Sequence, residues 1–343
     1  AIDSLLDWRA IFVFIAVVGA ASTVVAITVL SPAKPEVSSS EPARRSGLLD
    51  FDWVGTALSA ALLLTSMLAV TFAMDLGWSS PFIVGGFASS AILFAAFILW
   101  ERRRPAPMLP LSLFRSAAFS IGSAARFVSF MGGSSTFFLM PFFLVAGLGL
   151  TTAEAALYLM PAAATMTVFG PLSGRIADKI GPRIPAVVGM SLSTISMYLF
   201  SLVSLDTSPV MIAVASGLSG MGMSIFMAPN TSLILGSAAR QNYGIVSAFL
   251  NLTRNTAHII GIAIPTAVVV AVMSSLGYEA DLSDPEKLKD IELRAAYASA
   301  MARAFQVSVV MMLVAAVLAL VAPSSTRKAA DEEAKAPAQA TSR

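Results

Sequence analysis

Nine long apolar runs constrain the fold of this 343-residue chain more than any other feature. They cover residues 10–30, 53–74, 81–100, 119–147, 153–173, 184–204, 209–235, 243–273 and 302–322. About 20 apolar residues suffice to cross a bilayer as a helix, which satisfies its own backbone hydrogen bonds in lipid. Hydrophobic residues form 57% of the sequence and charged residues only 12%. We therefore predict an all-α integral membrane protein, a helical bundle of about nine transmembrane helices.

Lysine and arginine are unevenly distributed between the two sides of this bundle. The side that includes residues 174–183 and the C-terminal tail holds fifteen of them in its connections, and the opposite side holds five. Connections rich in these residues mark the cytoplasmic side. The sequence thus predicts a multi-pass protein of the cell (inner) membrane with a cytoplasmic C-terminus. The net charge is only +2, and the basic residues lie in short connections, so no basic surface for nucleic acid is expected.

A charged segment, GPLSGRIADKIGPR, joins two of the runs at residues 170–183. Gly174 and Gly181 permit close backbone approach or tight turning, and Pro182 interrupts the helical pattern. Arg175 and Asp178 are three residues apart, so they share a helical face and can pair. The full pattern comprises Gly174, Arg175, Asp178, Lys179, Gly181 and Arg183. It resembles the cytoplasmic loop signature of the major facilitator superfamily of secondary transporters, where it would act as a conformational gate. The alternative is an ordinary loop whose charges only set topology.

The order of the runs resembles the fourteen-span drug:proton antiporters of that superfamily. Family half-bundles have six helices with this loop between the second and third, and the runs within 119–322 fit that plan. The two runs within 53–100 resemble the pair inserted between the halves. The segments WERRRPAPMLPLSLFR and GIVSAFLNLTRNTAHIIGIAI also resemble this group, although Val145 stands where many relatives have Gln. The resemblance implies the C-terminal part of a transporter, with five N-terminal helices missing.

This layout predicts five parts of the chain. They are a last helix of a truncated N-terminal half (1–30), a cytoplasmic linker (31–52), two inserted helices with an interfacial segment (53–118), a C-terminal six-helix half (119–322) and a disordered cytoplasmic tail (323–343). The linker is rich in Pro, Ser and charge, and the interfacial segment places four arginines around a short apolar stretch. Asp284 and Pro285 predict the start of a helix that continues into the last run.

Polar residues within the runs are the candidates for a substrate cavity, because a central charge costs about 2.5–3.5 kcal/mol. Asn251, Arg254, Asn255 and His258 have the spacing of one helical face. Arg254 follows the start of its run by about 11 residues, which is roughly 16 Å into the membrane. We expect this face to meet a wet cavity or a partner carboxylate. The alternative is that these groups only hydrogen-bond neighbouring helices.

Arg126 and Asn230 complete the predicted cavity set. Arg126 follows the start of its run by about 8 residues, so its side chain could instead extend to the membrane surface. His258 is the only histidine. Imidazole titrates near neutral pH, which suits a proton carrier, although packing is the alternative role.

The acids show the opposite pattern, since none of the 20 lies in the middle of a run. A proton-coupled exporter needs a titrating group in its cavity, and a carboxylate is the usual choice. We therefore expect the coupling acid in the missing N-terminal helices, near Arg254. The sequence contains no cysteine and no catalytic, phosphate-binding or metal-ligating motif, so neither a cofactor, a metal site nor an enzyme is predicted.

The resemblance and the polar residues together predict a proton-coupled multidrug exporter that works by alternating access. Its partners would be protons, the lipid bilayer and lipophilic or cationic drug-like molecules. Two alternatives stay open: a uniporter or importer of a small nutrient, and a non-transporting membrane assembly partner.

Overall fold

The computed structural model describes residues 9–29, 52–76, 80–104, 110–239, 242–278 and 291–323. The regular elements in these ranges are all helices, which confirms the all-α prediction. The chain divides into two compact units, residues 1–51 and 52–343. Most of the predicted linker, the predicted helix start at Asp284 and the tail from residue 324 lie outside the described residues.

The first unit contributes one described helix, α2 (Arg9–Val29). Its hydroxyl side chains donate to backbone carbonyls of the preceding turn. The bonds run from Ser22 to Val18 at 2.8 Å and from Thr23 to Gly19 at 2.9 Å. The hydroxyls of this apolar helix are thereby satisfied without a partner helix.

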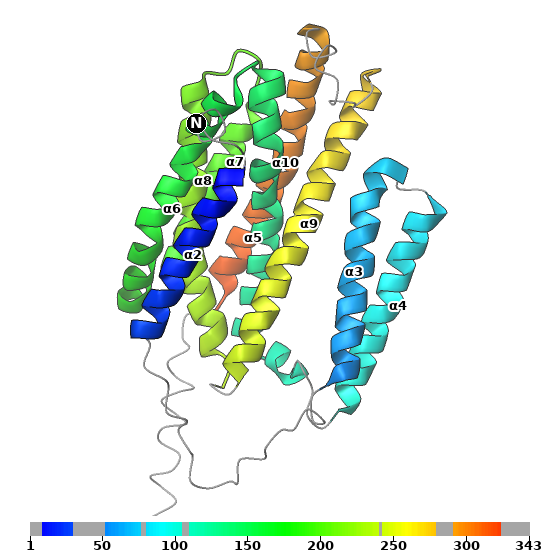
Figure 1. Cartoon of the computed structure of the whole chain (residues 1–343), viewed down its shortest axis with the longest axis vertical. Coiled ribbons are helices and arrows are strands. Elements are labelled where there is room, and N and C mark those ends of the chain that lie inside the picture. The colour runs from blue at the N-terminus through cyan, green and yellow to red at the C-terminus, as the bar shows by residue number, and fades with distance from the viewer. Residues whose placement is uncertain are drawn as a thin grey trace, which may run out of the picture. The chain divides into compact units, whose positions relative to one another are not determined.

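In the second unit, α3 (Trp53–Leu76) and α4 (Pro81–Arg103) form an antiparallel pair (Figure 1). The Thr65 and Ser90 hydroxyls hydrogen-bond across this pair at 3.0 Å. Small residues let the helices approach closely: a Cβ added at Gly86 would lie 2.9 Å from the Ala69 Cβ. A short 3-10 helix, η1 (Leu111–Arg115), follows within the predicted interfacial segment.

Six further α-helices build the main bundle (Figure 1). They are α5 (Ala117–Phe142), α6 (Thr152–Ile180), α7 (Arg183–Ser201), α8 (Pro209–Gly236), α9 (Tyr243–Ser275) and α10 (Ile291–Val321). A π-helical turn, η2 (Phe143–Gly147), extends α5 just after Pro141. α8 packs against α6 and α7, α10 packs against α5 and α7, and α5 packs against α9. The largest core side chains, among them Phe143, Phe200 and Phe305, are fully buried between these helices.

Glycine and serine set the spacing around α8. A Cβ added at Gly220 would lie 2.1 Å from the Ala162 carbonyl oxygen of α6. The hydroxyls of Ser173 and Ser196 donate to backbone carbonyls of α8, at 2.9 Å and 2.7 Å. Such contacts are typical of helix packing in membranes, where small residues allow close backbones and hydroxyls bond between helices.

Eight helices of the second unit are long and apolar enough to cross a membrane. They are α3 to α10, with the π-helical turn included in the α5 span. The apolar stretch described in α2, Phe12–Thr28, is shorter than a full span. The chain is therefore a multi-pass membrane protein, and every predicted run coincides with a helix.

The charged segment was expected to form a loop over residues 174–183, but most of it is helical. α6 continues to Ile180, so only Gly181 and Pro182 separate it from α7. Gly181 has φ +86°, a backbone conformation that favours glycine. A Cβ added at Gly174 would meet nothing within 4 Å, so the close approach predicted there is not found among the described residues. Asp178 likewise forms no ion pair with Arg175 within the described ranges.

Candidate functional site

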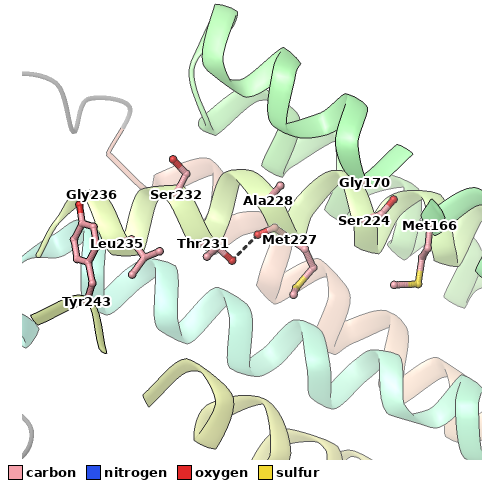
Figure 2. Close-up of a pocket in the computed structure, with 10 residues that line it drawn as sticks. All are labelled: Met166, Gly170, Ser224, Met227, Ala228, Thr231, Ser232, Leu235, Gly236 and Tyr243. Atoms are coloured by element: carbon pink, nitrogen blue, oxygen red, sulfur yellow. Dashed lines mark hydrogen bonds between the residues drawn. The ribbon is translucent and has the colours of Figure 1, made fainter. Parts of the chain in front are cut away.

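An open groove of about 780 Å³ runs along α8, between α6 and the start of α9. Figure 2 shows its wall as a row of α8 residues from Ser224 to Gly236. The lining residues are Met166, Gly170, Ser224, Met227, Ala228, Thr231, Ser232, Leu235, Gly236 and Tyr243. All ten are apolar or carry one hydroxyl or thioether, so the groove suits a lipophilic molecule.

Thr231 connects this groove to the buried Arg126 of α5. Its hydroxyl accepts a hydrogen bond from Arg126 Nη1 at 3.0 Å. The same hydroxyl donates one to the Met227 carbonyl at 2.8 Å (Figure 2). Arg126 is only 6% exposed, and its guanidinium carbon lies 5.3 Å from the centre of the Phe130 ring. The alternative that Arg126 extends to the membrane surface is therefore wrong.

Asn230 lies beside Thr231 on α8 and also contacts α5. Its side-chain amide donates to the Gly122 carbonyl at 3.0 Å, and the residue is 3% exposed. A Cβ added at Gly122 would lie 2.9 Å from Ile234, so glycine is needed for α8 to come this close. Gly122 and Arg126 are one helical turn apart, which places both α8 contacts on one face of α5.

His258 of α9 contacts α5 further along, at Ser134 and Phe130. Its Nδ1 lies 2.7 Å from the Ser134 hydroxyl, and its ring centre lies 5.1 Å from that of Phe130. A Cβ added at Gly261 would lie 2.3 Å from the Met131 carbonyl oxygen. The absence of a side chain at Gly261 thus lets α9 pack directly on α5.

The structure brings together four of the six predicted cavity residues. Arg254 is half-buried and interacts electrostatically with both Arg126 and His258. Asn251 and Asn255 are exposed and form no hydrogen bond among the described residues.

We use the name arginine cluster for Ser123, Arg126, Asn230, Thr231 and Arg254. Sequence reasoning missed Ser123, Thr231 and Ser134, since hydroxyl residues occur throughout these spans and carry no distinguishing signal.

Within the described ranges, no group of three His, Asp or Glu residues could hold a metal ion. The fold and the site together define a multi-pass α-helical membrane protein with an open groove along α8 and a basic cluster on α5 and α9. A sequence model of the Major Facilitator Superfamily matches residues 51–262, so the chain belongs to this superfamily.

Several curated proteins are similar to this chain. The tetracenomycin C resistance and export protein of Streptomyces glaucescens is 28% identical over 273 residues, which are 79% of this chain and 48% of that protein. The multidrug resistance protein Stp of Mycobacterium tuberculosis is 26% identical over 268 residues, 78% of this chain and 48% of Stp. The lincomycin resistance protein LmrB of Listeria monocytogenes is 26% identical over 207 residues, 60% of this chain and 43% of LmrB.

The chain spans about half the length of these relatives. Among solved structures, a bacterial homologue of the human lysosomal transporter Spinster is 18% identical, with a TM-score of 0.49. That match covers 77% of this chain and 67% of the other. The family comparison confirms the superfamily predicted from the charged segment, and the fourteen-span subgroup stays a prediction.

Proposed function

We propose that this chain is the C-terminal part of a proton-coupled exporter of drug-like molecules that works by alternating access. The observation that carries the proposal is the open groove along α8, with Arg126 buried behind Thr231. A groove that is apolar on its surface and charged behind one wall can hold a lipophilic molecule and recognise a polar group on it. Three similar proteins are named for antibiotic resistance, multidrug resistance or export, which supports this class of substrate.

The proposal places residues 119–322 as one six-helix half and residues 53–118 as an inserted pair with its interfacial segment. The remaining parts, residues 1–30, 31–52 and 323–343, would be the last helix of the other half, a linker and a tail. The distribution of Lys and Arg supports a cytoplasmic position for the α6–α7 connection and the C-terminus in the cell membrane. The charged residues at the end of α6 would then act as a gate at the cytoplasmic face.

Proton coupling requires a group that titrates inside the cavity. α5, α8 and α9 contain no Asp or Glu, so we assign the coupling acid to an N-terminal half. His258 is a second candidate, because imidazole can carry a proton near neutral pH. Its bond to Ser134 would then have to change during transport.

Drug transport by inverted membrane vesicles with an imposed proton gradient tests the proposal. The samples are the complete open reading frame, the same protein with Arg254→Ala, and the 343-residue chain by itself. Arg115→Ala is the matched control, because Arg115 is an exposed arginine outside the groove. We expect proton-driven drug uptake by the complete protein and by Arg115→Ala, and none by Arg254→Ala or by the chain alone.

Other results would contradict specific parts of the proposal. Full activity of Arg254→Ala would remove Arg254 from the transport cycle. Transport by the 343-residue chain alone would overturn its assignment as one part of the transporter. Substrate movement that ignores the proton gradient would indicate a uniporter.

A further inference from the structure

The arginine cluster contains three buried polar atoms that have no hydrogen-bond partner among the described residues. They are Arg126 Nε, Asn230 Oδ1 and Ser123 Oγ. All three residues are more than 90% buried, and their backbones belong to the closely packed helices α5 and α8. An unpaired buried polar group costs about 1–3 kcal/mol, and more when it is charged. Arg126 and Asn230 both bond across the contact between α5 and α8, so their unpaired atoms indicate a site there that a polar group occupies.

The positive charge of the arginine cluster indicates that the polar group in the site is negatively charged. Arg126 of α5 and Arg254 of α9 carry like charges on two helices that pack together, and α5, α8 and α9 contain no acid to balance them. The described acids of neighbouring α6 lie near its ends, and Glu154 already accepts from Thr151. A guanidinium cannot lose its charge in a protein, so an added anion would relieve this repulsion directly.

The donors of the cluster further restrict the chemistry. Of the five N–H donors on Arg126, only one bonds to a described side chain, the hydroxyl of Thr231. Free donors on a planar guanidinium match the two oxygens of a carboxylate. Asn230 Oδ1 accepts hydrogen bonds and therefore opposes any anionic oxygen, but it opposes the single charge of a carboxylate less than the higher charge of a fully ionised phosphate. The cluster therefore favours a carboxyl group.

We propose that Arg126, Arg254 and Asn230 form a carboxyl-binding site behind the Thr231 wall of the groove. The inference rests on the proposed function and changes the substrate it implies. A cation in the groove would be repelled by the two arginines, so this part of the transporter selects lipophilic molecules that carry a carboxylate. An acidic side chain from the rest of the protein could supply the same chemistry, and the experiment below separates the two sources.

The first measurement is thermal unfolding of the purified complete protein in detergent, with benzoate or with its neutral isostere benzamide. Binding to the folded state alone raises Tm. We expect benzoate to raise Tm in the wild type and in Arg115→Gln, and to have no effect in Arg126→Gln. Benzamide should have no effect in any of them. Arg126→Lys keeps the charge but loses the planar donors, so it should show a weaker benzoate response. It serves as a second variant if Arg126→Gln fails to fold.

The second measurement identifies a carboxyl that belongs to the protein. Dicyclohexylcarbodiimide labels buried carboxyl groups in their protonated form, and pairing with an arginine keeps an acid ionised. If an acidic side chain fills the site, benzoate will not stabilise the wild type, and mass spectrometry will find one acid labelled in Arg126→Gln but not in the wild type. This outcome supports the carboxyl site, assigns its occupant to the protein and overturns the selection of carboxylate substrates.

Two results overturn the inference. One is a benzoate effect that is equal in the wild type and Arg126→Gln. The other is the absence of both a benzoate effect and a newly labelled acid. Neither measurement requires transport, so the carboxyl site and the proposed export function can fail independently.

Discussion

Trp100 Nε1 donates a hydrogen bond to Asp52 Oδ1 at 3.0 Å, although the two residues are 48 positions apart in the chain. Asp52 precedes α3 and accepts the Gly55 backbone N–H at 2.9 Å, while Trp100 lies near the end of α4. Arg104 forms an ion pair with Asp52 at 3.4 Å, and its guanidinium lies 5.4 Å from the centre of the Trp100 ring. The Asp52 carboxylate therefore caps α3 and joins the start of α3 to the end of α4.

Substitution of Asp52 should reveal how much of the stability contributed by its contacts depends on its charge. Asp52→Ala removes the cap and the acceptor for Trp100, so we expect a loss of about 2–3 kcal/mol. Asp52→Asn keeps an N-cap oxygen and an acceptor and loses only the ion pair, so a loss of no more than about 1 kcal/mol is expected. Unfolding of the purified variants measures both. Equal losses would mean that charge, and not hydrogen bonding, dominates the junction.

The same carboxylate predicts a dependence of stability on pH. Burial of Asp52 opposes its ionisation, but the hydrogen bonds from Gly55 and Trp100 and the charge of Arg104 outweigh burial and lower the pKa of Asp52 below its ordinary value of 3.8. Because the pKa is lower in the folded state, the stabilisation is complete above the ordinary value and is lost as pH falls through the folded value.

This pH dependence can be measured as the difference in Tm between the wild type and Asp52→Asn, which has no titrating group at this position. The difference should be constant above about pH 5 and should shrink below about pH 4. A difference that persists unchanged at lower pH would contradict the assignment of the stabilisation to ionised Asp52.

The hydrogen bonds around Ser134 predict the tautomer of His258. The Ser134 hydroxyl lies 2.6 Å from the Phe130 carbonyl, which can only accept, so its single proton is used there. The 2.7 Å contact with His258 therefore needs a proton on Nδ1. Nitrogen NMR of histidine-labelled protein can test this prediction without ambiguity, since the chain has one histidine. Ser134→Ala should shift the signal towards the Nε2–H form, and an Nε2–H form in the wild type would contradict the assignment.

Two glycines of α9 provide a matched test of the α5–α9 contact. A methyl group at Gly261 would overlap the Met131 backbone, so Gly261→Ala should destabilise the protein by about 1–3 kcal/mol. Gly244 has nothing within 4 Å of an added Cβ, so Gly244→Ala should be neutral or stabilising by about 0.5–1 kcal/mol. Thermal unfolding of the two purified variants measures both changes in stability. Equal effects would show that the tight contact at Gly261 is absent in the protein.

Most of the fold was predictable because the length and polarity of a span are local properties. Every apolar run corresponds to a helix, and the superfamily followed from residues within one short segment. The boundaries were less accurate around residues 174–183, because polar residues continue a helix once it leaves the membrane. Hydropathy marks the membrane boundary, and backbone conformation at Gly181 marks the end of the helix.

The candidate site was predictable only as a set of residue types. The cost of polar groups in lipid singled out Arg126, Asn230, Arg254 and His258, whichever helices they contact. The same rule also selected Asn251 and Asn255, which are exposed. It gave no signal for Thr231, since a hydroxyl can bond to its own helix and is then compatible with any surroundings.

The sequence by itself determined which segments cross the membrane and which superfamily the chain belongs to, because both depend on residues close together in the chain. The tertiary structure alone decided that Arg126 is buried and bonds to Thr231, 105 positions away. That pairing depends on which faces of α5 and α8 meet. Close contacts at glycines such as Gly122 set those faces, and a pattern within a single helix does not contain this information.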